Sequence, residues 1–184
     1  ALATRVLSTV NSSASGTSRR IASIHQAVVM LGHQHLRTIV LTFTVIERLT
    51  KGVEARVYTE FWKRSLTTGL VASALAKLKD VDTDDGYTAG LLADIGILLL
   101  AQFEPDRYLK IFDGHPHGPQ LIAAEQAEFG FDHADLGARM LEIWGFPQEI
   151  VIAVNSHHDS DEAEMFDLAS LVRAGNLMPG AIWI

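Results

Sequence analysis

The residues best suited to chemistry are one acid in an apolar stretch and a small group of histidines. Asp94 is the only polar side chain between Ala89 and Ala101. This stretch predicts a helix, on which apolar residues three and four positions away flank the carboxyl group on both sides. A carboxylate in such surroundings is strongly destabilised by lost hydration unless it is paired or binds a cation. Asp94 is therefore expected to have a positively charged partner, either a side chain or a metal ion.

Three histidines could supply further ligands for such a cation. His133 lies at the predicted start of a helix, and His157 and His158 are adjacent near the end of another. Imidazole nitrogens and carboxylate oxygens are common ligands of divalent transition metals. Adjacent residues on a helix point about 100° apart, so we expect no single ion to take both His157 and His158, and one of the two to face solvent. For His133, a structural place in the first helical turn is the simpler explanation.

Composition limits the class of protein. The chain has 184 residues, of which 48% are hydrophobic, enough for the core of one domain. Its formal net charge of −7 is unfavourable for binding a nucleic-acid backbone, and the absence of cysteine excludes disulfides and thiolate metal sites. No apolar run reaches the roughly 18 residues that span a bilayer, and the N-terminus is no signal peptide. We therefore expect a soluble cytoplasmic protein that does not bind a membrane.

Apolar residues recur at helical spacing along nearly the whole chain. The first half predicts helices over Leu2–Val10, Ser23–Met30 (ended by Gly32), His33–Leu49 and Thr59–Lys79. A strand over Thr38–Val45 is the alternative, because several of these residues are β-branched.

Turn sequences divide the second half of the chain. The breaks fall at the acidic segment Asp80–Gly86, at Gly114–Pro119 and at Gly130–Asp132, where Asp132 is a good N-cap for the helix that contains His133. Pro147 fits the first position of the next helix, which should run to His157 and His158. The whole pattern predicts an all-α fold with about eight to ten helices.

Seven segments in order resemble one known family. They are Leu7-Ser-Thr-Val-Asn-Ser-Ser, Ile24–Gly32, Phe61-Trp-Lys-Arg-Ser65, Gly90-Leu-Leu-Ala-Asp-Ile-Gly96, Glu125 to Gly130-Phe-Asp-His133, Gly137 to Trp144-Gly-Phe-Pro147, and His157-His158. Their order and spacing resemble HDOD domains, which are bacterial signalling modules related to the HD phosphohydrolases. The resemblance implies an HD-domain-like helical bundle with an N-terminal helical subdomain. It also implies one domain over residues 1–184, with the N-terminal part over 1–52, truncated upstream, and the HD-like core over 53–184.

The resemblance also implies where a metal site would lie. HD proteins hold a divalent ion between histidines and aspartates on several helices, and the ion activates water for attack on a phosphoester. In this chain Arg64 stands where the first histidine would be, and the His-Asp doublet reads Ala93-Asp94. No aspartate stands near Asn176 in the last helix. The surviving members of the set are Asp94, His133, His157 and His158.

Arg64 suggests what has replaced the ion. A guanidinium is always charged and repels a cation. If the family geometry holds, Arg64 points at Asp94 and forms a buried ion pair in place of the metal. We therefore expect no metal cofactor. Any ion that did bind would use the four surviving residues.

These features predict a non-catalytic regulatory domain. By resemblance, it would act in bacterial signal transduction through a protein partner or through covalently linked sensor or output domains, without nucleic acid. Two alternatives stay open. One is a residual metal-dependent phosphohydrolase acting on a nucleotide or cyclic dinucleotide. The other is a sensor that binds an anionic small ligand in the vacated pocket. A homodimer is also open, because the apolar run Leu36–Leu49 could be core or interface.

Overall fold

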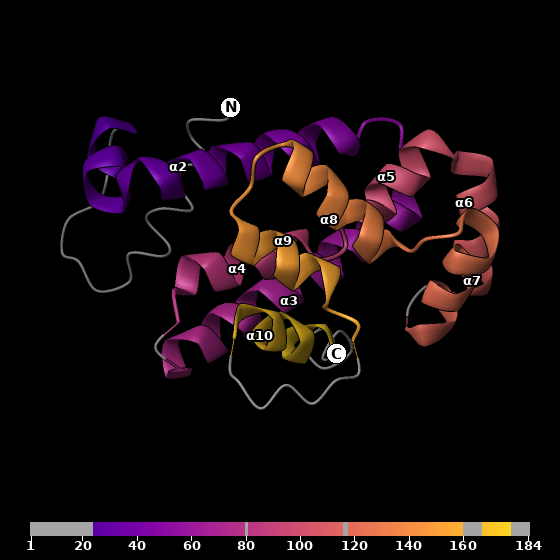
Figure 1. Cartoon of the computed structure of the whole chain (residues 1–184). Coiled ribbons are helices and arrows are strands. Elements are labelled where there is room, and N and C mark those ends of the chain that lie inside the picture. Colours follow the sequence, from indigo (N-terminus) through magenta and orange to yellow (C-terminus); the bar gives the residue numbers. More distant parts are fainter. Residues whose placement is uncertain (1–23, 80, 116–117, 160–166, 178–184) are drawn as a thin grey trace. The chain divides into compact units, whose positions relative to one another are not determined.

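The computed structural model describes residues 24–79, 81–115, 118–159 and 167–177, and every regular element among them is a helix. The all-α prediction is therefore confirmed, whereas the helix predicted over Leu2–Val10 lies outside the described residues. The elements, labelled in Figure 1, are α2 (Ile24–Leu49), α3 (Ala55–Lys79), α4 (Thr83–Leu92), α5 (Ile95–Phe103), α6 (Pro105–Gly114), α7 (Pro119–Phe129), α8 (His133–Ile143), α9 (Gln148–Asn155) and α10 (Leu168–Asn176).

The first described helix differs from the prediction in one respect. A single helix, α2, covers the region for which a break at Gly32 was predicted, and the strand alternative over Thr38–Val45 is wrong. A glycine inside a helix costs only about 1 kcal/mol relative to alanine, which the flanking helical segments can offset. Gly32 therefore lowers the stability of α2 but does not end the helix.

The chain divides into two compact units, residues 1–48 and residues 49–184. The sequence analysis predicted one domain with an N-terminal part that ends at residue 52. All the candidate site residues belong to the second unit, which contains helices α3 to α10. The architecture that positions the site is therefore that of the second unit alone.

The apolar stretch around Asp94 is two helices and not one. Helix α4 ends at Leu92, helix α5 begins at Ile95, and Asp94 occupies the N-cap position of α5 with φ −92° and ψ 15°. The prediction of one helix over Ala89–Ala101 is therefore wrong. The break lies at the residue whose carboxyl group is bound to another helix, so a tertiary contact overrides the local helical pattern.

The same stretch passes a length and composition test for a membrane span. Within the described residues this holds for one segment, Thr83–Phe103, and 83% of its most apolar window is buried inside the protein. The break at Asp94 interrupts it. A core helix of a globular domain satisfies the same test, and the burial is consistent with that role.

The hydrophobic core of the second unit joins α3, α5, α6 and α7. Tyr108 and Leu121 are completely buried in it, together with Val57, Ile97, Leu100, Ala101 and Phe112. Helices α6 and α7 form a hairpin at one end of this unit (Figure 1). The core fixes the start of α5, where Asp94 lies, relative to α3.

Small residues let α3 approach two other helices closely. A Cβ atom on Gly90 of α4 would lie 2.7 Å from the backbone nitrogen of Gly69 in α3. A Cβ atom on Gly175 of α10 would lie 2.7 Å from the carbonyl oxygen of Thr68. Distances this short exclude any side chain at either glycine without movement. Helix α3 is therefore held against α4 and α10, which brings Arg64 within reach of Asn176 in α10.

Candidate functional site

The centre of the candidate site is a buried ion pair between α3 and the start of α5. Arg64 Nε donates to Asp94 Oδ2 at 2.8 Å, and Arg64 Nη2 donates to Asp94 Oδ1 at 3.2 Å. The two residues are 6% and 1% exposed. Both oxygens of the carboxylate are thus engaged by one guanidinium, the bidentate arrangement in which arginine and carboxylate fit best.

His133 approaches the pair because the starts of α5 and α8 touch. A Cβ atom on Gly96 would lie 2.0 Å from the carbonyl oxygen of His133, so only glycine fits there. Asp132 caps α8 as predicted, accepting from the backbone N–H groups of Ala134 and Asp135. This cap places His133 at the first position of the helix, with its Nε2 atom 3.3 Å from Asp94 Oδ1.

A buried acid on α7 holds the other side of the His133 ring. Glu125 Oε2 lies 2.7 Å from His133 Nδ1 and also accepts from the His133 backbone N–H at 2.9 Å. Its second oxygen accepts from the hydroxyl of Tyr108 at 2.8 Å. Glu125 and Tyr108 are both completely buried. The three hydrogen bonds fix the orientation of the His133 ring from behind.

His157 and His158 lie together in the turn after α9. Helix α9 ends at Asn155, not at the histidines as predicted, so the angular spacing of a helix does not apply to them. Their ring centroids are 3.8 Å apart, and His157 is buried while His158 is half-buried. The expectations that the rings diverge and that one faces solvent are therefore wrong.

Each of these two histidines faces the centre of the site. His157 Nδ1 lies 2.6 Å from the Val154 carbonyl, and its Nε2 atom lies 3.4 Å from Asp94 Oδ1. That Nε2 atom is buried and has no hydrogen-bond partner in the described part of the chain. His158 Nε2 lies 2.9 Å from His133 Nε2. Three imidazole rings thus surround the side of Asp94 that faces α8 and α9.

The end of α10 closes the site. Asn176 Oδ1 accepts from Arg64 Nη2 at 3.3 Å. A neutral amide thus stands in the last helix, where HD proteins were expected to have an aspartate. Asn176 adds a hydrogen bond to the guanidinium without adding a charge.

Asp94 stays ionised in spite of its burial. Burial alone would raise its pKa, but the Arg64 guanidinium and the neighbouring rings of His133 and His157 outweigh this effect. The pKa of the carboxyl therefore lies well below its usual range. The pair is a true ion pair under all ordinary conditions.

The proton on His133 follows from its neighbours. Burial alone would lower the pKa of His133, but hydrogen bonds and charge from Asp94 and Glu125 raise it to about 9. The imidazolium then donates Nδ1–H to Glu125 Oε2, and its Nε2 atom lies 3.3 Å from Asp94 Oδ1 and 2.9 Å from His158 Nε2. His158 stays neutral, because burial and the nearby rings of His157 and His133 lower its pKa to about 2.

Asn176 also contacts His158. Its Nδ2 atom lies 3.3 Å from His158 Nδ1, a hydrogen bond in which the amide N–H donates when that ring nitrogen carries no proton. Asn176 therefore links Arg64, through its oxygen, to His158, through its nitrogen.

The ligand atoms of the site are spaced as in a metal centre, but the charges around them are unfavourable for a metal ion. The ligand atoms of Asp94, His133, His157 and His158 all lie within 4.8 Å of one another. Ligand atoms around a tetrahedral zinc ion are about 3.4 Å apart. However, Arg64 binds both oxygens of Asp94, and the inward nitrogen of His133 carries a proton. In this state the residues do not fit a metal ion.

The charges inside the site balance without any ion. Arg64 and the His133 imidazolium carry two positive charges, and Asp94 and Glu125 carry two negative ones. A divalent cation would add two uncompensated charges to a buried site, which costs several kcal/mol. Binding would require Arg64 to leave and His133 to lose its proton.

Sequence reasoning missed part of this site. It selected Arg64 and Asp94 but not Glu125 or Tyr108, and it read Asn176 only as a missing aspartate. Glu125 carried one signal, since it is an acid in the apolar half of α7, within the segment that resembles HDOD domains. No sequence signal marked Tyr108, because a tyrosine in a core helix is common and its hydroxyl can find a hydrogen-bond partner that has no part in a site.

Comparison with known proteins gives the family. The model of the HDOD domain family matches residues 1–160 of this chain. The chain therefore belongs to the HDOD domain family, and the family and the fold class predicted from the sequence are both confirmed.

Individual relatives are distant and longer. The chain is 26% identical over 184 residues to an uncharacterised protein of Treponema pallidum (strain Nichols), covering 96% of this chain and 35% of that protein. It resembles the crystal structure of a candidate phosphohydrolase from Shewanella amazonensis SB2B, with 27% identity, a TM-score of 0.75, and coverage of 97% of this chain and 64% of the other. It also resembles the MmoQ response regulator of Methylococcus capsulatus str. Bath, with 28% identity, a TM-score of 0.59, and coverage of 97% and 71%. The chain spans about a third of the first relative and less than two thirds of the second.

Proposed function

We propose that this HDOD domain is a non-catalytic regulatory module that acts in the cytoplasm by binding a protein partner or a covalently linked sensor or output domain. The observation that supports this proposal is the bidentate Arg64–Asp94 pair, in which a guanidinium takes the place of the metal ion of HD phosphohydrolases. Because Arg64 engages both oxygens of Asp94, this carboxylate has none left for a Lewis-acidic ion that would polarise a phosphoester or activate a water molecule. The response-regulator name of one structural relative agrees with a signalling role.

The first test is the metal content of the protein purified without chelator, measured by elemental mass spectrometry. We expect far less than one divalent ion per chain. In the Arg64→His variant the repelling charge is replaced by a fourth imidazole, and we expect about one zinc ion per chain to bind, because the other four ligand residues are already within reach.

A matched control lies next to Arg64 on the same helix. Lys63 is exposed and forms a surface ion pair with Glu60, so the Lys63→His variant adds a histidine without opening the site. We expect this variant to bind no more zinc than the parent protein. One tightly held ion per chain in the parent protein would contradict the proposal.

A residual phosphohydrolase is the second candidate function. It is favoured by the convergence of Asp94, His133, His157 and His158, and by the name of the Shewanella relative. Hydrolysis of a chromogenic phosphodiester in the presence of Mn²⁺ separates the two functions. Activity that a chelator abolishes and that the Asp94→Asn variant lacks would favour the enzyme.

A sensor of anionic ligands has less support from the geometry. Arg64 uses Nε and Nη2 for Asp94, and Nη2 also donates to Asn176. Arg64 Nη1 is buried and has no hydrogen-bond partner among the described residues, so it could donate to an anion. A phosphate that also took Nε or Nη2 would have to break the buried pair, which costs several kcal/mol.

A further inference from the structure

Helix α10 ends at the border between the buried charged site and the solvent. Its last residue, Asn176, is half-buried, whereas Arg64 and Asp94 are 6% and 1% exposed. The residue that follows, Leu177, is 81% exposed. A change in the contacts of Asn176 would therefore alter the surface of the protein.

The side-chain amide of Asn176 joins two other elements. Its Oδ1 atom accepts from Arg64 Nη2 on α3 at 3.3 Å, and its Nδ2 atom lies 3.3 Å from His158 Nδ1 in the turn after α9. Both distances are at the long end of the range for hydrogen bonds. The end of α10 is therefore held by weak bonds that can break without unfolding the helix.

Packing holds the rest of α10. Leu171 and Val172 are 2% and 0% exposed. A Cβ atom on Gly175 would lie 2.7 Å from the carbonyl oxygen of Thr68, so α10 lies directly against α3 there. None of these four residues is charged. Helix α10 thus has two different attachments: uncharged packing along its length, and the amide of Asn176 at its end.

The attachment at the end shares a donor atom with the buried ion pair. Arg64 Nη2 carries two N–H groups, and it lies 3.2 Å from Asp94 Oδ1 and 3.3 Å from Asn176 Oδ1. A second bond to Asp94, from Arg64 Nε at 2.8 Å, fixes the plane of the guanidinium. Asp94 therefore holds Nη2 where it donates to Asn176, and breaking the pair would withdraw this donor.

We propose that Asn176 is a latch that fastens the end of α10 only while the Arg64–Asp94 pair is intact. This inference rests on the proposed regulatory function, because it names the element through which the state of the buried pair reaches the surface. Leu177, beside the latch, gives a partner protein an exposed apolar side chain to contact. Since coupling is reciprocal, a partner that held the released end would weaken the buried pair by the same factor.

The test is amide hydrogen exchange of the isotopically labelled chain, followed by NMR. The Leu177 N–H donates to the Arg173 carbonyl in the last turn of α10, so its exchange rate reports the state of the end. Val172, buried in the middle of the helix, is the internal reference. We expect Asn176→Ala to speed the exchange of Leu177 about tenfold and to leave that of Val172 unchanged.

The decisive variant is Asp94→Asn, which alters the pair without altering α10. The new amide keeps one acceptor oxygen and turns an NH₂ group toward the guanidinium, so the two-bonded arrangement with Arg64 is lost. We expect the exchange of Leu177 to rise about tenfold here too. In the double variant with Asn176→Ala it should rise no further, because both changes open the same latch.

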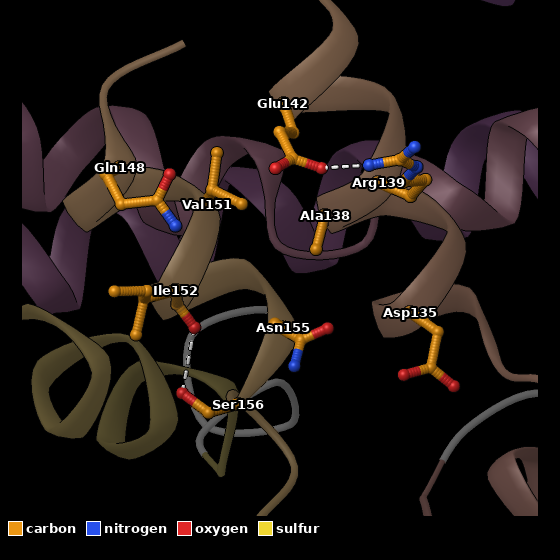
Figure 2. Close-up of a pocket in the computed structure, with 9 residues that line it drawn as sticks. All are labelled: Asp135, Ala138, Arg139, Glu142, Gln148, Val151, Ile152, Asn155 and Ser156. Atoms are coloured by element: carbon orange, nitrogen blue, oxygen red, sulfur yellow. Dashed lines mark hydrogen bonds and ion pairs between the residues drawn. The ribbon is translucent and has the colours of Figure 1, made fainter.

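Two control variants separate the latch from simpler causes. Asn155 is likewise the last residue of its helix, α9, and Figure 2 shows it in a surface hollow, joined by no hydrogen bond to the side chains drawn with it. Asn155→Ala should leave the exchange of Leu177 unchanged. Leu121→Ala removes a completely buried side chain far from α10 in sequence and lowers overall stability. Because helix ends open locally, it should not speed the exchange of Leu177.

Several results would overturn the latch: parent-like exchange of Leu177 in Asn176→Ala or in Asp94→Asn, an equal rise at Val172 in Asn176→Ala, additive effects in the double variant, or an equal rise in either control. The metal and hydrolysis assays test the proposed function separately. A protein without metal or activity whose α10 does not respond to Asp94→Asn would refute only the latch.

Discussion

At the scale of single residues, Arg64 decides what this site can do. Its guanidinium neutralises Asp94 at 2.8 Å and 3.2 Å and leaves no carboxylate oxygen free for an ion. A buried pair of this kind adds little to stability when it is whole, because lost hydration offsets the attraction. Removing one member is costly, because the remaining charge stays buried.

Replacing either member of the pair should therefore destabilise the protein strongly. We expect the Arg64→Met variant to lose about 3 kcal/mol of unfolding free energy, measured by urea titration with circular dichroism. The double variant Arg64→Met with Asp94→Asn should recover part of this loss, since neither charge is then left alone.

The control for this prediction is a surface pair on the same helix. Lys63 and Glu60 are exposed, so Lys63→Met should change the unfolding free energy by less than about 0.5 kcal/mol. Equal losses in Lys63→Met and Arg64→Met would show that the buried pair is not responsible.

At the scale of elements, glycines determine which helices can meet at the site. Gly96 lets the start of α5 touch the first residue of α8, and Gly90 lets α4 cross α3 at Gly69. These contacts place Asp94, His133 and Arg64 side by side although they come from three helices. Site geometry therefore depends on residues that carry no chemistry.

A methyl group at Gly96 should change the geometry of the site, although Gly96 has no side chain in it. Its Cβ atom would lie 2.0 Å from the His133 carbonyl oxygen, so α5 and α8 must move apart. We expect Gly96→Ala to lose about 1–3 kcal/mol of unfolding free energy and to shift the NMR signals of the His133 ring.

Gly114 at the end of α6 is the matched control. A Cβ atom there meets nothing within 4 Å, so Gly114→Ala should leave stability unchanged or raise it by up to about 1 kcal/mol. A Gly96→Ala variant as stable as the Gly114→Ala variant would contradict the close contact between α5 and α8.

At the scale of the whole molecule, the buried charges make stability depend on pH in both directions. His133 has a folded pKa of about 9, above its unfolded value of about 6.5, so its contribution is complete below pH 6.5 and is lost as pH rises through 9. His158 has a folded pKa of about 2, so its contribution is present above pH 6.5 and decreases as pH falls below it. Asp94, whose pKa is lowered, adds a further loss below about pH 4.

The unfolding free energy should therefore be greatest near pH 6.5 and decrease on both sides. Urea titrations across this range should show an alkaline decrease of up to about 3 kcal/mol. The His133→Gln variant should lose the alkaline arm while keeping much of the acid arm. An alkaline arm of equal size in His133→Gln would assign it to another group.

The sequence by itself determined the fold class, the family and the choice of central residues. Helical periodicity predicted the all-α fold, and seven motif segments indicated the HDOD domain family; both predictions are confirmed. Asp94, the one acid in an apolar stretch, predicted a cationic partner, and the family resemblance identified Arg64 as that partner. Such signals are local or depend on order along the chain, so one sequence is enough to read them.

Only the tertiary structure decided how the residues around Asp94 converge. His157 and His158 share one side of the site because α9 ends before them, and the end of a helix depends on contacts that no local pattern contains. Glu125 and Tyr108 support His133 from helices α7 and α6, which meet it only after the core has formed. The break at Asp94 has the same origin, since its carboxylate bonds across 30 residues to Arg64 and not to its own helix. Long-range pairing of buried charges is a property of the packed molecule, and the sequence specifies it only through that packing.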